Sequence, residues 1–167
     1  MATTSSGTAT VTLPTDEQIL ITREFDAPRH LVFEAWTTPE LVKRWWNAKR
    51  AEMTVAEIDL RVGGKWRYAM VTEDGFEVAF HGEYREIVPS ERIVSTETYE
   101  GVPEGVSEED ATTVNTATFA EADGRTTLTI LVQASSKESR DAIVESGMEA
   151  GLQDALDLLE EVAVSLR

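Results

Sequence analysis

The spacing of apolar residues changes near residue 135, and this change limits the folds that the chain can adopt. Residues 53–134 contain short segments in which apolar and polar residues alternate, each bounded by turn-forming residues. From about residue 137 the apolar residues recur every three or four positions until the end of the chain. A period of two predicts strands, and a period near 3.6 predicts a helix. The chain therefore predicts consecutive strands followed by one long helix.

Seven segments of the chain carry the strand pattern. Those after residue 53 are joined by short turn signals such as Gly63-Gly64, and by one acidic loop over residues 100–110. Short connections join antiparallel strands, whereas parallel strands need long crossovers, so an antiparallel meander is predicted. The expected strands cover residues 18–26, 54–62, 65–72, 76–88, 92–99, 112–121 and 126–134.

Three helices are predicted around this sheet. Two short amphipathic segments, residues 28–37 and 38–47, follow the first strand, and each has a proline in its first turn. The third helix is expected over residues 137–166. A sheet and one long helix bury their apolar faces when the sheet curls around the helix. The sequence therefore predicts an α+β helix-grip fold, a curved antiparallel sheet of about seven strands with a cavity between sheet and helix.

Length and charge limit the organisation and the partners. A chain of 167 residues closes one core, which we expect over residues 16–167 behind a flexible segment 1–15. No apolar run approaches the roughly 18 residues that span a bilayer, and no leader pattern is found, so a cytoplasmic protein without membrane insertion is expected. The absence of cysteine excludes disulfides. A net charge of −16 opposes nucleic-acid binding.

Aromatic and long apolar side chains form the predicted cavity wall. Side chains two apart on a strand share a face, as do those three or four apart on a helix. The ten residues assigned to the wall are Trp36, Trp45, Trp66, Tyr68, Met70, Phe80, Tyr84, Tyr99, Met148 and Leu152. Tyrosine hydroxyls would orient a ligand in an otherwise apolar pocket. The alternative is that the same aromatic residues only fill the core.

Trp45 and Trp46 are adjacent, and helical neighbours diverge by about 100°. One of them is therefore expected to face the cavity. Trp45 is expected to do so because it lies four residues after Leu41, and Trp46 is expected to pack or to face solvent. On the long helix, Gly147 and Gly151 lie one turn apart, which favours close backbone packing over space left for a ligand.

Catalytic and metal-binding patterns are weak in this sequence. Four residues could form a polar cluster for acid–base chemistry if their strands pair in register, but surface ion pairs are the favoured alternative. These residues are Asp59, Arg61, His81 and Glu83. With only two histidines and no cysteine, no metal site is expected. Gly63-Gly64 lies between strands and not ahead of a helix, so no phosphate-binding loop is present. We expect no cofactor and assign no catalytic residue.

Four segments of the chain carry a resemblance to a known family. They are "FDAPRHLVFEAWTTPELVKRWW", "DLRVGGKWRYAM", "GEYREIVPSERIVSTETY" and "GMEAGLQDALDLLEEV". In this order they resemble the bacterial proteins related to the activator of the 90-kDa heat-shock protein ATPase, in the START-like (SRPBCC) group. The resemblance covers about residues 16–166 and implies the helix-grip fold of the birch-pollen allergen. One departure is Gly151-Leu152, where many relatives carry Gly-Trp.

The resemblance implies three functions. Members of the wider group bind lipids, sterols and polyketides, so we expect a small hydrophobic or amphipathic ligand (a lipid, polyketide or aromatic-like molecule) in the cavity. The first alternative is a polyketide cyclase or dehydratase-type enzyme, which needs two ionisable side chains facing the cavity. The second is a co-chaperone that acts on a heat-shock chaperone ATPase. The eukaryotic activator has an additional chaperone-binding domain ahead of this one, whereas about fifteen residues precede the first strand here. A monomer and a homodimer both fit the sequence.

Overall fold

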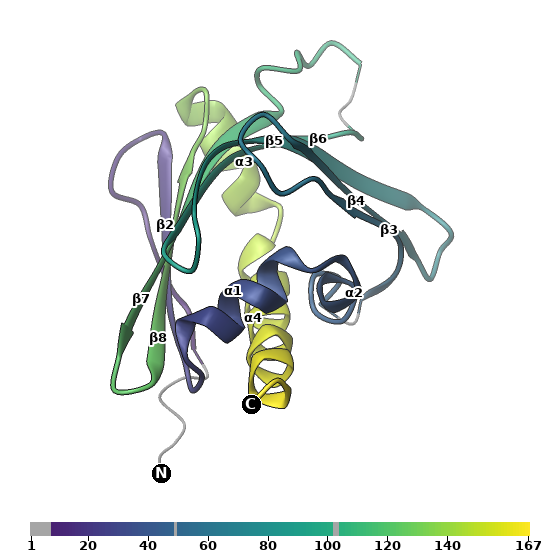
Figure 1. Ribbon diagram of the computed structural model, residues 1–167. Coiled ribbons are helices and arrows are strands. Elements are labelled where there is room, and N and C mark those ends of the chain that lie inside the picture. Colours follow the sequence, from purple (N-terminus) through teal and green to yellow (C-terminus); the bar gives the residue numbers. More distant parts are fainter. Residues whose placement is uncertain (1–7, 49, 102–103) are drawn as a thin grey trace.

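The computed structural model describes residues 8–48, 50–101 and 104–167. Its strands are β1 (Thr10–Thr12), β2 (Gln18–Phe25), β3 (Ala51–Ile58), β4 (Lys65–Thr72), β5 (Glu77–Val88), β6 (Arg92–Tyr99), β7 (Thr112–Ala122) and β8 (Arg125–Gln133). Its helices are α1 (Arg29–Thr37), α2 (Pro39–Val42), α3 (Lys137–Glu145) and α4 (Met148–Ser165). The strands form one antiparallel sheet in the order β1-β2-β8-β7-β6-β5-β4-β3 (Figure 1).

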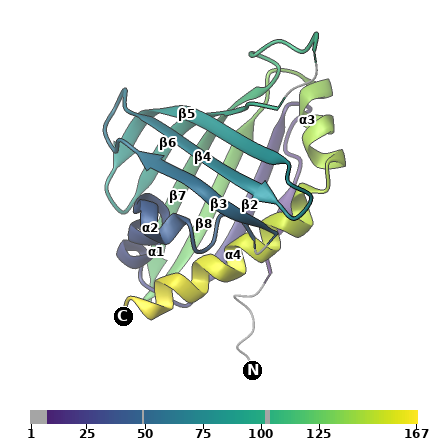
Figure 2. The same cartoon turned by 90° about the vertical axis from the view of Figure 1, so that its right-hand side faces the viewer.

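The sheet curves, and α1, α2 and α4 lie on its concave side (Figures 1 and 2). Alternation along the strands explains this arrangement. In β2 the side chains of Ile19, Ile21 and Phe25 point inward and are buried, whereas Leu20 and Thr22 between them are half-buried. A strand with one apolar face must cover that face with another element. The predicted helix-grip fold is confirmed.

The tightest packing occurs where α1 and α4 meet β2, β7 and β8. Phe25, Phe119, Leu156 and Leu159 each expose 1% or less of their surface. The ring of Phe33 in α1 packs edge-to-face on Phe119, with centroids 5.6 Å apart. This half of the concave face is therefore closed by protein side chains.

The N-terminal segment contributes an eighth strand, one more than expected. Val11 of β1 pairs with Ile21 of β2, inside the segment expected to be flexible. Ala9 is buried, and its backbone N–H and C=O both bond to the Gln153 side chain of α4, at 3.0 and 2.9 Å. Residues 1–7 of that segment lie outside the described residues. A three-residue strand has too few positions for alternation to reveal it.

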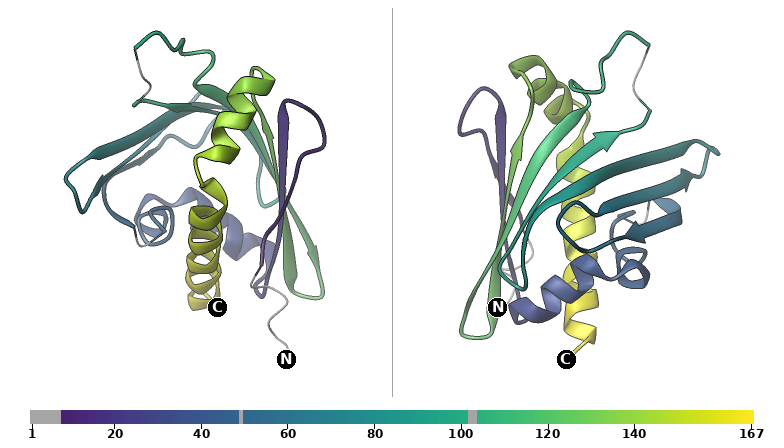
Figure 3. Two further views of the ribbon diagram at one scale, coloured as in Figure 1. Left: turned by 180° about the vertical axis from the view of Figure 1, so that it is seen from behind. Right: turned by 45° about the horizontal axis from the view of Figure 1, so that its top comes forward.

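The C-terminal helix is interrupted, which corrects the single helix expected over 137–166. Gly147 adopts φ 82° and ψ 22°, a left-handed conformation that ends α3 and begins α4. The two helices appear as separate segments when the molecule is seen from behind (Figure 3). Conformational freedom at this break, and not close packing, accounts for Gly147.

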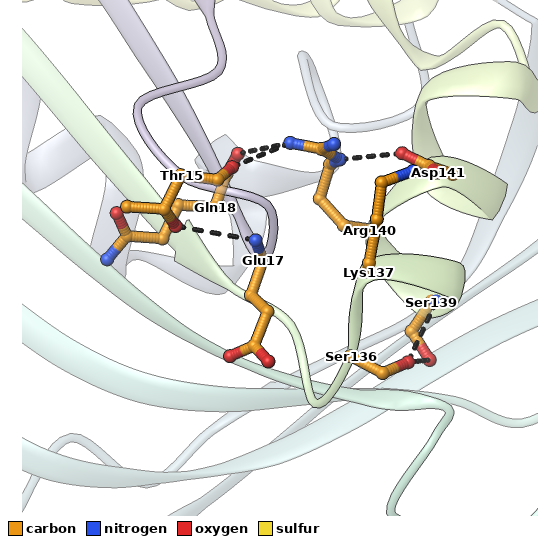
Figure 4. A network of polar contacts seen from close by, with 8 residues as sticks. All are labelled: Thr15, Glu17, Gln18, Ser136, Lys137, Ser139, Arg140 and Asp141. Carbon is orange, nitrogen blue, oxygen red and sulfur yellow. Dashed lines mark hydrogen bonds and ion pairs between the residues drawn. The ribbon is translucent and has the colours of Figure 1, made fainter.

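Buried Arg140 fixes the short helix α3 to the segment that leads into β2 (Figure 4). Its guanidinium donates to the carbonyl oxygens of Thr15, at 2.7 Å, and Gln18, at 3.4 Å, and pairs with Asp141 at 2.9 Å. The Ser136 hydroxyl accepts from the Ser139 N–H at 3.1 Å and caps the helix. Side-chain hydrogen bonds therefore position α3.

The second short helix ends earlier than expected. α2 stops at Val42, and residues 43–48 form turns instead of continuing to Asn47. The N–H of Trp45 bonds to the Val42 carbonyl in the tighter i−3 pattern, and Ala48 has a positive φ of 54°. The two tryptophans consequently lie on a turn-rich segment whose side-chain directions do not follow helical spacing.

Candidate ligand-binding face

Strands β4, β5 and β6 bring most of the predicted wall together. Their register pairs Tyr68 with Phe80 and Phe80 with Tyr99, so the three side chains share the concave face. Ring centroids lie 4.8 Å apart for Trp66 and Tyr68, and 5.1 Å apart for Phe80 and Tyr99. Trp66 and Tyr68 are buried, Phe80 is half-buried and Tyr99 is exposed. Strand parity therefore located this part of the face.

Trp46, and not Trp45, packs on these strands. The Trp46 ring lies 5.2 Å from the centroids of both Tyr68 and Phe80 and is half-buried. Trp45 exposes only 4%, stacks 5.1 Å from Trp36 and donates its indole N–H to the Ala35 carbonyl at 2.9 Å. The expected orientation of the pair is thus reversed, because the chain leaves helical geometry after α2.

We use the name aromatic wall for the rings that share this surface, Trp46, Trp66, Tyr68, Phe80 and Tyr99. Of the other wall candidates, half-buried Trp36 packs against Trp45 and on Phe119, with centroids 5.8 Å apart. Met70 is half-buried and pairs with Met53 of β3. Trp36 therefore belongs to the contact between α1 and the sheet, whereas Met70 extends the inward face of β4.

Gly82 allows Trp66 to take its place in the aromatic wall. The two residues are directly paired between β4 and β5. The Trp66 indole N–H donates to the Thr96 carbonyl at 3.1 Å. A Cβ at Gly82 would lie 1.8 Å from that carbonyl oxygen and 2.5 Å from the indole nitrogen. The glycine is therefore required by a close approach of backbone and ring.

Glu97 is a carboxylate on this inward face that our sequence reasoning did not select. It lies between Ser95 and Tyr99 with the same parity on β6, and it is half-buried. The Asn115 side chain donates to Glu97 Oε1 at 3.3 Å, and the Thr113 hydroxyl donates to Asn115 Oδ1 at 2.9 Å. The signal was present in the sequence, because one carboxylate interrupts an otherwise uncharged inward row.

Burial raises the pKa of three groups on this face. Desolvation raises the pKa of Glu97 to about 7, against the lowering effect of the Asn115 hydrogen bond. Desolvation likewise raises the pKa of Tyr84 to about 12, and it holds the pKa of Tyr68 well above the ordinary value, with the Tyr84 and Glu97 charges adding to that rise. At neutral pH both hydroxyls keep their protons, and Glu97 exchanges its proton readily.

The first half of α4 is less completely buried than the second half. Met148 and Leu152 are half-buried, whereas Leu156 and Leu159 further along the helix are fully buried. A Cβ added at Gly151 would meet no atom within 4 Å. The expectation of close backbone packing at Gly151 is therefore wrong, and that part of the helix faces open space.

Two hollows occur on the surface of the described residues, and neither is lined by α4. One, of about 590 Å³, is lined by His81, Thr98, Tyr99, Glu100, Val106, Glu108 and Ala111. The other, of about 340 Å³, lies beside the start of β3 and the end of β4. Neither hollow is the cavity expected between sheet and helix.

The four residues of the possible polar cluster form separate pairs. Asp59 pairs with Arg61 at 2.8 Å in the β3–β4 connection, and Glu83 pairs with Lys65 at 3.3 Å. His81 instead contacts Glu100. These are partly exposed pairs, as the favoured alternative proposed.

Glu100 lies at the centre of a separate ion-pair group. It accepts hydrogen bonds from the Arg67 guanidinium at 2.9 and 3.0 Å and lies 2.9 Å from His81 Nδ1. The Arg67 hydrogen bonds lower the pKa of Glu100 to about 2. Among the residues that the structure describes, no group of three potential metal ligands occurs.

The curved antiparallel sheet, the two helices inserted after β2 and the C-terminal helix on the concave side define a helix-grip protein. The family model for Activator of Hsp90 ATPase homolog 1-like protein matches residues 26–163. The chain belongs to this family. A comparison with curated proteins gave no match. No helix in the described ranges is both long and apolar enough to cross a membrane.

Solved structures from several bacteria resemble the chain. A protein from Rhodobacter sphaeroides is 22% identical, with 94% of this chain and 99% of that chain covered and a TM-score of 0.84. A protein from Chromobacterium violaceum is 27% identical over 87% of this chain and 96% of its own, with a TM-score of 0.72. An AHSA1-like protein from Aeromonas hydrophila is 21% identical over 88% and 93%, with a TM-score of 0.66.

Proposed function

We propose that the protein binds a small hydrophobic or amphipathic molecule on its concave face, between the aromatic wall and the first half of α4. The partly accessible aromatic wall carries this proposal. Half-buried Phe80, Met148 and Leu152 support it, because they lie on the concave side yet stay partly accessible. Each methylene group that a ligand buries there would contribute about 0.8 kcal/mol before the cost of association.

Binding is favoured over catalysis by the composition of the face. A cyclase or dehydratase would need two groups that exchange protons near neutrality. Within the described parts of β4, β5 and β6, Glu97 is the inward group with such a pKa, whereas Tyr68 and Tyr84 hold their protons. A single acid–base group together with two hydroxyl groups suits the orientation of a bound polar head.

The experiment uses the neutral probe N-phenyl-1-naphthylamine, whose fluorescence rises in apolar surroundings. Gly151→Leu places a side chain in the open space and also removes a helix-destabilising glycine. Probe affinity should fall at least tenfold in this variant, with the unfolding midpoint unchanged or raised. Loss of binding without loss of stability cannot come from unfolding.

The matched control compares alanine substitutions of two phenylalanines that are four residues apart. Phe80→Ala removes a ring of the aromatic wall, whereas Phe76→Ala removes a ring that is 69% exposed in the β4–β5 turn. Only the first should weaken probe binding. Absence of saturable binding to the unaltered protein, or equal losses in both variants, would overturn the proposed function.

A further inference from the structure

Glu97 has more accepting capacity than the structure uses. An ionised carboxylate offers about four acceptor positions. The described residues supply one hydrogen bond, the long 3.3 Å contact from Asn115 to Oε1. A half-buried carboxylate with so few donors is costly unless a further donor arrives.

The residue opposite Glu97 on β5 is a glycine, and a ring of the aromatic wall lies over it. The register of β5 and β6 pairs Phe80 with Tyr99 and Tyr84 with Ser95, which sets Glu97 opposite Gly82. The Trp66 indole takes the space over Gly82, so a ring of the aromatic wall, and not a β5 side chain, lies beside Glu97. The Tyr68 hydroxyl is close enough for the Glu97 charge to raise the pKa of Tyr68.

The surroundings of Glu97 suit a cation. Ring faces of tryptophan, tyrosine and phenylalanine attract ammonium groups, and the aromatic wall contains all three kinds. The described inward residues of β4, β5 and β6 include no lysine or arginine. Buried Arg23, on β2, is paired with Asp157 at 2.9 Å and Glu160 at 3.1 Å. An anionic head would meet a carboxylate here without a compensating cation, whereas an ammonium head would meet its counter-ion.

We propose that this face selects amphipathic molecules with an ammonium head, which Glu97 accepts while the apolar tail lies along the aromatic wall. This inference rests on the proposed function. It adds the chemical class of the ligand, namely a long-chain amine, and the residue that recognises it.

Displacement of the neutral probe tests the inference with twelve-carbon ligands that share one tail. Dodecylamine and dodecanoate are compared at pH 7.5 below their micelle concentrations, and dodecanol is used below its solubility limit. Dodecylamine should displace the probe at a concentration at least tenfold lower than dodecanoate, with dodecanol between them. In Glu97→Gln the advantage of the amine over the alcohol should disappear, while dodecanol binding is retained.

The control separates recognition at Glu97 from general attraction to an acidic protein. Glu83→Gln makes the same change of charge on the neighbouring strand, at a partly exposed residue that pairs with Lys65. It should leave the preference for the amine intact. An equal loss of preference in Glu83→Gln, or tighter binding of dodecanoate than of dodecylamine, would overturn the inference but leave the proposed binding function standing. Failure of every ligand to displace the probe would overturn both.

Proton release gives a second readout that a purely structural role of Glu97 would not produce. A bound ammonium lowers the pKa of a neighbouring carboxyl, which for Glu97 begins at about 7. The titratable groups that face it, Tyr68 and Tyr84, stay protonated at this pH. Calorimetry at pH 7 in two buffers of different ionisation enthalpy should therefore detect release of about half a proton when dodecylamine binds. No release in the unaltered protein, or the same release in Glu97→Gln, would contradict the assignment.

Discussion

The raised pKa of Glu97 makes the stability of the folded protein depend on pH in a direction opposite to that of most carboxylates. The folded protein holds the Glu97 proton more tightly than the unfolded chain, because its pKa rises from 4.5 to about 7. The stabilising contribution of this proton is fully present below the unfolded pKa of 4.5. It is lost as the pH rises through about 7.

Glu97→Gln removes this linkage, because glutamine resembles the protonated acid at every pH. At about 1.4 kcal/mol for each pKa unit, the shift corresponds to about 3 kcal/mol. The variant should match the unaltered protein in stability near pH 4.5. It should become more stable than the unaltered protein by up to about 3 kcal/mol at pH 8.

Urea unfolding followed by tryptophan fluorescence, at constant ionic strength from pH 4.5 to 8.5, measures this difference. Glu83→Gln is the control, because it makes the same change of charge at a partly exposed residue whose partner, Lys65, stays charged over this pH range. The difference between Glu83→Gln and the unaltered protein should stay nearly constant from pH 5.5 to 8. A constant difference for Glu97→Gln over the same range would refute the raised pKa.

Four further substitutions test the packing of the fold and the role of Trp46 in binding. Trp45→Ala should lower the free energy of unfolding by about 3–5 kcal/mol, because Trp45 is buried against α1. Trp46→Ala should mainly weaken probe affinity. Urea titration and probe titration of both variants measure the two effects. Gly82→Ala should destabilise the fold by several kcal/mol or prevent folding, since its Cβ would meet the Thr96 carbonyl; thermal unfolding checks this. Gly151→Ala should raise stability by about 1 kcal/mol, and an unchanged or lower unfolding midpoint would contradict an open, unstrained site there.

The sequence predicted the sheet well because alternation and short turns determine antiparallel neighbours. Register follows from the same rule, so Tyr68, Phe80 and Tyr99 were assigned to one face before their contacts were known. Strand β1 was not predicted, because its three residues are placed by pairing with β2 and by a contact with Gln153, which is remote in sequence. Such tertiary contacts leave no local pattern in the sequence.

The candidate site was predicted less completely, for two different reasons. Strand parity predicts that Glu97 faces inward, because it lies between Ser95 and Tyr99. A cavity wall defined by aromatic and apolar side chains does not include a carboxylate. The roles of Trp45 and Trp46 could not have been found in this way. Their directions depend on the end of α2 at Val42 and on ring contacts with strands that lie far away in the sequence.

The concave face divides into a closed half and an accessible half, and this division bears on how binding and stability coexist. Phe25 and Leu156 are fully buried where β2 and the second half of α4 meet, so the folding core is complete there. Half-buried Phe80 belongs to the other half, which β4, β5 and β6 form. Interior packing is costly to disturb only where atoms already fill the space. On the proposed function, ligand atoms would therefore replace water in the accessible half without opening the core, and separate substitutions would change binding and folding.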